Sequence, residues 1–251
     1  MDRLIYTAMS GAAQALEQQS VTANNLANAS TTGFRAQLSA FRQVPMNFEN
    51  GASGDATTRT FVLSSTPTAD YTPGPIQQTG NPLDVAVQGP GWLSVQTQDG
   101  GEAYTRAGNL HVDANGQLVT ANNLPVIGNS GPMSIPPGAE VTIGKDGTVT
   151  ALMPGDPPTS IATVDQLKLV NPDAGTLTRG DDGLFRTADN QPADADPTVT
   201  VAPASLEGSN VNAVSAMVDM ITNARQFQMQ TKLLDSANSN DQSANKLLDF
   251  S

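Results

Sequence analysis

The sequence predicts an α+β protein, in which a mainly-β central domain is flanked by N- and C-terminal α-helices that pack together as a coiled-coil-like inner domain. Apolar residues recur at helical spacing near both ends, apolar and polar residues alternate in the middle, and hairpin-type turns separate the alternating stretches. We divide the chain into an N-terminal helical arm and turn, an extended connecting region, a β-rich body and a C-terminal helical arm. Their predicted ranges are 1–35, 36–80, 81–208 and 209–251.

Residues 3–28 are predicted to form the first helix. Steps of four and three residues place seven side chains on one stripe, which is typical of a helix that packs along a seam. The opposite face is polar but almost uncharged, so two interpretations stay open: the helix packs only on its own domain, or neighbouring chains cover it as well. The apolar stripe consists of Ile5, Met9, Ala12, Leu16, Ala23 and Leu26.

A polar turn is predicted to end this helix. Asn24, Asn25 and Asn28 bring three amides to its C-terminal end, and Gly33 supplies the left-handed backbone conformation that a helix terminus often needs. Buried amides need hydrogen-bond partners, so a buried cluster would be geometrically specific. For any single asparagine, a solvated helix cap is the alternative.

The connecting region contains glycine, proline and small polar residues, which predict turns and extended segments. We expect a flexible loop at 47–58 and a strand at 60–64. The β-rich body follows, with Asn115-Gly116 and Asp146-Gly147 as hairpin-type turns between alternating strands. The alternation places the single histidine, His111, on a solvated strand face.

A second helix is predicted to begin at Val214, with Asn210 or Asn212 as its N-cap, and to extend as far as Leu248. Its apolar residues again follow steps of three and four, so this helix and the first one can bury their stripes against each other. The residues assigned to assembly on this arm are Met217, Met220, Ile221, Ala224, Phe227, Leu234 and Leu248.

The formal net charge is −12, and residues 48–208 carry 6 basic and 18 acidic residues, so this middle part of the chain holds all of it. Nucleic acid is therefore an unfavourable partner, because phosphate binding needs clustered lysine and arginine. This also argues against a helix-turn-helix interpretation of the asparagine-rich helix end. No apolar run approaches the roughly 20 residues of a membrane span, and we expect neither membrane insertion nor a cleaved signal peptide.

Catalytic and metal-binding patterns are weak throughout. The chain has no cysteine and one histidine, which argues against thiolate chemistry and histidine-rich metal sites. Gly89-Pro90-Gly91 lacks the helix that a dinucleotide motif requires, and the Asp113 turn lacks the acidic twelfth residue of a calcium loop. Asp181 and Asp182 are adjacent, and a turn explains them better than an acid–base pair. We therefore expect no enzyme, cofactor, metal or small-molecule substrate.

Three stretches, in this order along the chain, resemble the signatures of the flagellar basal-body rod and hook protein family. The resemblance covers essentially the whole length. It is carried by Asn25-Leu26-Ala27-Asn28 through Thr32-Gly33-Phe34-Arg35, by Thr79 to Ala86 with Gly91-Trp92 and Tyr104-Thr105-Arg106-Ala107-Gly108, and by Leu206 to Asn212 with Arg225-Gln226-Phe227-Gln228-Met229.

The resemblance implies a non-enzymatic axial subunit that binds copies of itself and other rod subunits. The length and the stretch at 153–158 are most similar to proximal-rod members, with distal-rod members second and a hook-type subunit as a further alternative. Export through the flagellar type III gate is implied, with Phe34 and Leu38 matching the export motif and Phe41 as the competing aromatic residue. The acidic body leaves a different hypothesis open, namely a rod-associated module that binds or hydrolyses peptidoglycan.

Overall fold

The structure is a computed structural model that describes residues 2–39, 41–45, 60–64, 68–155, 157 and 160–248. Residue contacts divide the chain into two compact units, which we call the helical unit and the β unit. The helical unit comprises Met1–Ala27, Gln37–Ala69 and Asn212–Ser251, and the β unit comprises Asn28–Ala36 and Asp70–Val211. The predicted α+β class is confirmed, because two terminal helices pack together and the region between them is mostly strands.

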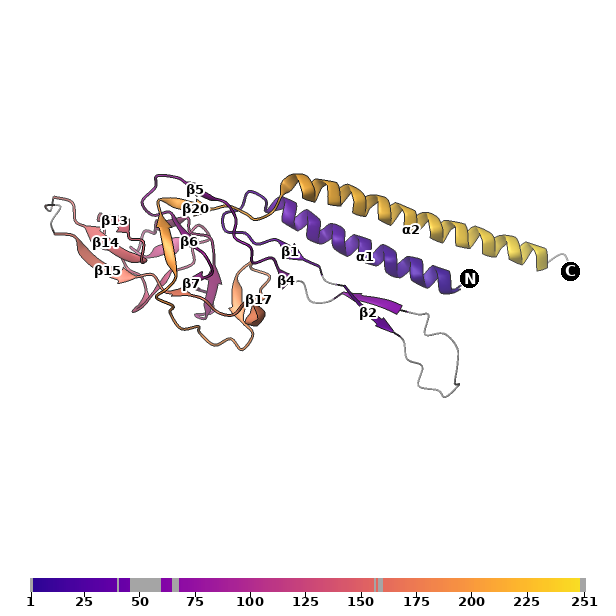
Figure 1. The fold of residues 1–251 in the computed structure, drawn as a ribbon, viewed down its shortest axis with the longest axis horizontal. Coiled ribbons are helices and arrows are strands. Elements are labelled where there is room, and N and C mark those ends of the chain that lie inside the picture. Colours follow the sequence, from indigo (N-terminus) through magenta and orange to yellow (C-terminus); the bar gives the residue numbers. More distant parts are fainter. Residues whose placement is uncertain are drawn as a thin grey trace. The chain divides into compact units, whose positions relative to one another are not determined.

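Two long helices form most of the helical unit and lie side by side in Figure 1. They are α1 (Asp2–Ala27) and α2 (Ala213–Leu248). Two short antiparallel ladders complete the unit: β1 (Gln37–Leu38) with β4 (Thr68–Ala69), and β2 (Phe41–Pro45) with β3 (Thr60–Ser64). The predicted strand at 60–64 is confirmed, whereas the predicted loop at 47–58 lies outside the described residues.

Asn212 caps α2, which decides between the two predicted caps. Its side-chain oxygen accepts hydrogen bonds from the backbone amides of Val214 at 3.0 Å and Ser215 at 3.2 Å. These amides have no partner within the helix, so the cap stabilises the first turn by about 1 kcal/mol.

Small and polar side chains line the contact between α1 and α2. Asn223 donates a hydrogen bond to the Thr22 hydroxyl at 3.4 Å, and Gln230 approaches Gly11 so closely that a Cβ built there would lie 3.0 Å from its amide nitrogen. Asn223 and Gln230 are seven residues apart, and the same step reaches the buried residues Ala216 and Ala237. The helices are therefore antiparallel, with a seven-residue repeat at their contact.

The predicted seam is partly wrong on both helices. Period and spacing are as expected, but the inward stripe of α1 passes through the buried residues Ala8 and Ala15, one position before the predicted Met9 and Leu16. Met9 and Leu16 are 54% and 50% exposed. Alanine allows the two helix axes to approach closely, so the larger side chains are rotated outward.

The same shift occurs on α2. Met217 and Ile221 are 53% and 55% exposed, whereas Met220, Phe227 and Leu234 are half-buried beside the contact, as predicted. The side chain of Leu248 lies outside the described part of the chain.

The β unit is built from short strands around one apolar core. A five-stranded antiparallel sheet has the order β16-β7-β8-β18-β17, a three-stranded sheet has the order β13-β14-β15, and the other strands form two-stranded ladders. The bounds are β5 (Ile76–Gln78), β6 (Val85–Gln88), β7 (Trp92–Gln96), β8 (Glu102–Thr105), β9 (Leu110–Val112), β10 (Leu118–Thr120), β11 (Ile127–Gly128), β12 (Gly131–Pro132), β13 (Glu140–Ile143), β14 (Thr148–Leu152), β15 (Ala162–Gln166), β16 (Leu169–Val170), η1, a short 3₁₀ helix (Ala174–Thr176), β17 (Leu177–Arg179), β18 (Phe185–Thr187), β19 (Thr200–Pro203) and β20 (Ser205–Glu207).

Alternation along these strands produces the core. Val85 and Val87 of β6 and Leu93 and Val95 of β7 are almost fully buried and pack together with Leu118. The hairpins predicted at Asn115-Gly116 and Asp146-Gly147 are confirmed as the β9–β10 and β13–β14 turns. The expected exposure of His111 is also confirmed, because the burial alternates along β9.

Candidate functional site

A buried ion cluster joins three segments that are far apart in the sequence. The carboxylate of Glu207 on β20 accepts hydrogen bonds from Arg35 Nη2 at 2.7 Å and from Arg106 Nη1 at 3.0 Å. The three side chains are at most 4% exposed. All three residues belong to the β unit, where Arg35 lies at the end of the first signature stretch and Arg106 follows β8.

Further contacts hold the cluster. Glu207 also accepts the backbone amide of Gly74 at 2.8 Å, and Arg106 donates to the carbonyls of Val87 at 3.1 Å and Gly89 at 2.6 Å. The guanidinium carbon of Arg106 lies 5.3 Å from the centre of the Trp92 ring, within the range of a cation–π contact. Glu207 thus fixes both arginines, and Arg106 extends the network to β6 and β7.

The cluster contains more positive charge than negative. Two guanidinium groups share one carboxylate, and within the described residues Arg35 Nε and Nη1 and Arg106 Nε have no hydrogen-bond partner. Burial lowers the pKa of Arg106, while the carboxylate of Glu207 opposes that shift. A buried cluster with one anion depends strongly on that anion.

Gly33 lets the first signature stretch approach the cluster. Its φ of +68° lies in the left-handed region, as predicted, and its amide donates to the backbone carbonyl of Glu207 at 2.8 Å. A Cβ added at Gly33 would lie 2.2 Å from the carbonyl carbon of Arg106. Because that atom is backbone, a side chain at Gly33 would push the first signature stretch away from the central one.

Gly33→Ala is therefore expected to destabilise the β unit by about 2–4 kcal/mol, combining a strained backbone and a steric clash. Gly80→Ala is the matched control, because Gly80 has a φ of +80° but nothing within 4 Å of its added Cβ. The control should lose only about 1 kcal/mol. Urea unfolding of the two variants measures the difference, and equal losses would contradict the close approach.

Two asparagines bind the chain that follows this turn. In the helical unit, Asn25 accepts the backbone amide of Gln37 at 2.8 Å and donates to its carbonyl at 2.9 Å. In the β unit, Asn210 accepts the amide of Ala36 at 2.7 Å and donates to the carbonyl of Asp70 at 2.9 Å. Both amides act as backbone mimics that fix an extended segment. Asn25 thus has the specific partner that a buried amide needs.

The remaining residues of the turn have different environments. Phe34 is 8% exposed, with the guanidinium carbon of Arg179 4.6 Å from its ring centre, whereas Leu38 is 49% exposed. Arg179 also donates to the carbonyl of Arg35 at 3.1 Å. Asn28 accepts, through its backbone carbonyl, the amide of Thr31 at 3.1 Å.

Large apolar side chains cover the outer faces of the two helices. On α2 they recur mostly three or four residues apart, and on α1 they are seven apart, so each helix presents an apolar stripe away from the α1–α2 contact. A soluble helix pair normally buries such residues between its helices. The side chains that are about half exposed or more are Met9, Leu16, Val214, Met217, Val218, Ile221, Met229 and Leu233.

The described part of the chain lacks the features of membrane-spanning helices and of metal sites. No helix there has the length and apolar character that crossing a membrane requires. Within the same residues, histidine, aspartate and glutamate side chains do not gather in groups of three that would suit a metal ion. Asp182 is hydrogen-bonded to Arg186, which lowers the pKa of its carboxyl group, and this does not suit a general acid.

Three family descriptions match separate parts of the chain. "Flagella basal body rod protein" matches residues 5–35, "Flagellar hook protein FlgE/F/G D1 domain" matches 86–151, and "Flagellar basal body rod FlgEFG protein C-terminal" matches 202–247. The flagellar basal-body rod protein FlgF of Escherichia coli (strain K12) is 54% identical over 257 aligned positions, which cover 100% of both chains. The chain belongs to the flagellar basal-body rod protein family.

Other members of the rod protein family indicate the subtype. FlgF of Salmonella typhimurium (strain LT2) is 52% identical over 100% of both chains, whereas FlgG of Buchnera aphidicola subsp. Schizaphis graminum is 32% identical over 90% of this chain and 91% of its own. The chain is thus more similar to these FlgF members than to this FlgG member. Its function is that of a structural subunit of the flagellar rod.

The buried cluster takes one residue from each of the three regions that match the rod protein family. Arg35 lies in the first, Arg106 in the second and Glu207 in the third. All three residues lie within the signature stretches, but no sequence pattern assigned them to a site. The signal that could have found them is that every signature contains a charged residue, although Asp84 and Arg225 are charged members of the signatures as well.

Proposed function

We propose that this chain polymerises into the bacterial flagellar basal-body rod through the outer faces of α1 and α2. The observation that carries this proposal is the reversed distribution of side chains in the helical unit. Alanine, threonine, asparagine and glutamine occur at the contact between the helices, while Met9, Leu16, Met217 and Ile221 are about half exposed outside it. Neighbouring subunits would remove this apolar surface from water, which favours association.

The residues predicted for subunit assembly take two roles in this proposal. Met9, Leu16, Ala23, Met217 and Ile221 are exposed and would contact neighbouring subunits directly. The others whose side chains are described are buried or half-buried within the helical unit, so they would set the shape of the assembling surface. Those with described side chains are Ile5, Ala12, Leu26, Met220, Ala224, Phe227 and Leu234.

Membership of the rod family supports the finer parts of the proposal. The chain would leave the cytosol through the flagellar type III export gate, span the periplasm within the rod and transmit torque towards the hook. Phe34 and Leu38 are the proposed export motif. Because Phe34 is buried beneath Arg179, the gate would meet its ring only in a chain that is unfolded at this turn.

We further propose that the chain is not an enzyme and that its partners are itself and other rod subunits. The acidic pair at 181 and 182 gives little support to peptidoglycan hydrolysis, because Asp182 is engaged by Arg186 in the turn between β17 and β18. The described side chains of the site bind backbone groups and one another, and these contacts hold segments of the chain in place.

Deletion of the gene tests this function in cells. We expect loss of motility, loss of every structure distal to the base of the rod, and restoration by the wild-type chain. Imaging of purified basal bodies should then place the chain in the rod. Normal flagella in the deletion strain, or a position outside the rod, would contradict the proposal.

A further inference from the structure

Three methionine side chains of the helical unit are open to solvent. Met9 on α1 and Met217 and Met229 on α2 are each more than half exposed. They belong to the apolar stripes that face away from the α1–α2 contact. The folded monomer therefore leaves these thioether groups within reach of small molecules in solution, and its stability depends little on their packing.

Methionine carries all of the sulfur in this chain, which contains eight methionines and no cysteine. Cysteine thiolates, which peroxides readily oxidise, are therefore absent. In the β unit, Met133 is 2% exposed, and its methyl carbon would lie 2.9 Å from a Cβ built at Gly128. Met153, which follows β14, is 43% exposed. The β unit thus offers one shielded and one accessible methionine for comparison.

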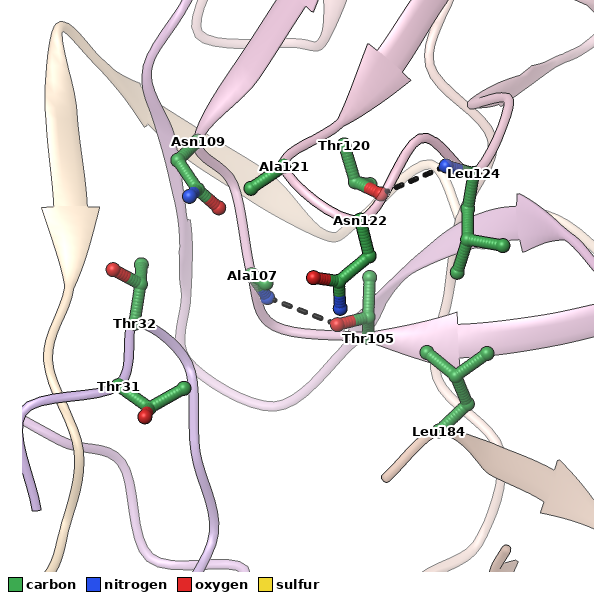
Figure 2. A pocket seen from close by; sticks show the side chains of 10 residues that line it. All are labelled: Thr31, Thr32, Thr105, Ala107, Asn109, Thr120, Ala121, Asn122, Leu124 and Leu184. Carbon is green, nitrogen blue, oxygen red and sulfur yellow. Dashed lines mark hydrogen bonds between the residues drawn. The ribbon is translucent and has the colours of Figure 1, made fainter. Parts of the chain in front are cut away.

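A small pocket in the β unit does not change this contrast. Figure 2 shows it beside the turn that carries Thr31 and Thr32, with a volume of about 140 Å³. Its lining consists of threonine, asparagine, alanine and leucine residues. An oxidant that entered this pocket would meet no sulfur there, so Met133 stays shielded in the apolar core.

Exposed thioethers react with hydroperoxides. A lone pair on the sulfur attacks the terminal oxygen of the peroxide, the O–O bond breaks, and a methionine sulfoxide forms. With hydrogen peroxide the other product is water, so the sulfur loses two electrons and the peroxide gains them. Methionine sulfoxide reductases reverse the change.

The sulfoxide has different consequences in the monomer and in an assembly. In the monomer its oxygen can accept hydrogen bonds from water, because the side chain is exposed. Against a neighbouring subunit the same oxygen would be buried, and a buried polar group without a hydrogen-bond donor is costly. The side chains beside these methionines on the two stripes include Leu16, Val218 and Ile221, which have no donor to offer.

We propose that Met9, Met217 and Met229 are oxidation sites, at which a peroxide converts the folded monomer into a form that cannot join the rod. The modification is reversible, and it leaves the β unit and the α1–α2 contact intact. The inference rests on the proposed function, because the sulfoxides act through faces that neighbouring subunits would cover.

The reactivity is tested on the purified full-length monomer. It is treated with hydrogen peroxide, and peptide mass spectrometry follows the sulfoxide at each methionine. We expect Met9, Met217 and Met229 to react at least about tenfold faster than Met133, since a buried side chain reacts only when the structure opens. Met153 should react as well, and the circular dichroism spectrum should stay unchanged. Equal rates at Met133, or a loss of helical signal, would overturn the proposal.

The effect on assembly is tested with two triple variants in a strain from which the gene is deleted. Replacing Met9, Met217 and Met229 with leucine keeps their volume and apolar character, so this variant should swarm like wild type. Replacing them with glutamine imitates the polar sulfoxide in a residue that favours helices. The glutamine variant should enter basal bodies at least about tenfold less often. Met153→Gln is the matched control and should swarm normally.

Hydrogen peroxide separates oxidation from substitution. Cells that lack methionine sulfoxide reductases and produce the wild type or the leucine variant are grown with peroxide, and the chain in their basal bodies is quantified. Other proteins are oxidised alike in both strains, so a fall for the wild type alone supports the proposal. An equal fall in both strains, or normal swarming by the glutamine variant, would overturn it and leave the proposed function intact. Normal flagella in the deletion strain would overturn both.

Discussion

Replacing Glu207 with glutamine is expected to destabilise the β unit by about 3–5 kcal/mol, the usual cost of breaking a buried ion pair from one side. Glutamine retains the size and shape of the side chain but removes its negative charge. Arg35 and Arg106 would then remain buried with two positive charges and no anion. Neither guanidinium can readily lose its proton to relieve that cost.

The measurement is urea unfolding followed by the fluorescence of Trp92. This is the only tryptophan in the chain, and it lies 5.3 Å from the guanidinium carbon of Arg106 and 5.9 Å from that of Arg35. Its emission therefore reports on the cluster as well as on global unfolding. The loss of stability should appear as a lower urea midpoint.

Asp182→Asn is the matched control, since it also exchanges a carboxylate for an amide in an arginine pair. The Asp182 and Arg186 side chains are 43% and 28% exposed. An exposed pair contributes at most about 1 kcal/mol, so this variant should unfold close to the wild-type midpoint. Similar midpoints for Glu207→Gln and Asp182→Asn would show that the buried cluster does not hold the β unit together.

The second prediction concerns a pair of substitutions on the outer face of α2. The double variant Met217→Glu and Ile221→Lys should abolish rod assembly and motility while leaving the monomer as stable as wild type. Both native side chains are more than half exposed, so the monomer loses little packing. Glutamate four residues before lysine also stabilises an exposed helix, and the net charge stays the same.

Assembly is expected to weaken because, in the wild type, each of these apolar side chains would be buried against a neighbouring subunit. Burying one such side chain contributes about 1.5–3 kcal/mol, so the pair accounts for at least a hundredfold in association. Circular dichroism melts measure the monomer, and sedimentation and swarming assays measure assembly.

Ser236→Glu with Asn240→Lys is the control for that variant. It introduces the same charges at the same spacing, at two exposed polar positions of the same helix. This control should assemble and support swarming. Normal swarming by the Met217 and Ile221 variant, or an equal defect in both variants, would contradict the assignment of this face to assembly.

Local patterns predicted much of the fold. The Asn212 cap, the hairpins at Asn115-Gly116 and Asp146-Gly147, and the alternation that exposes His111 each depend on residues a few positions apart. Such short-range chemistry is present in the sequence itself. The three signatures likewise predicted the family, and the comparisons confirmed it.

Local patterns did not predict which face of each helix contacts the other helix. A seven-residue repeat predicts that one stripe of side chains faces the partner helix. Two such stripes are possible on α1: both contain Ala12, but one adds Met9 and Leu16 and the other adds Ala8 and Ala15. Hydrophobicity favoured the stripe with Met9 and Leu16, whereas close packing selected the one with Ala8 and Ala15. That choice depends on the shape of α2, which lies more than 180 residues away in the sequence.

The sequence by itself determined the two terminal helices, the β-rich middle, the acidic charge of that middle and the family. The tertiary structure decided that Arg35, Arg106 and Glu207 form one cluster, and that Met9, Leu16, Met217 and Ile221 lie outside the contact between the helices. Glu207 is 172 residues from Arg35 and 101 from Arg106 along the chain. The physical reason is that an ion pair, or the choice between two helix faces, depends on atoms that only folding brings together.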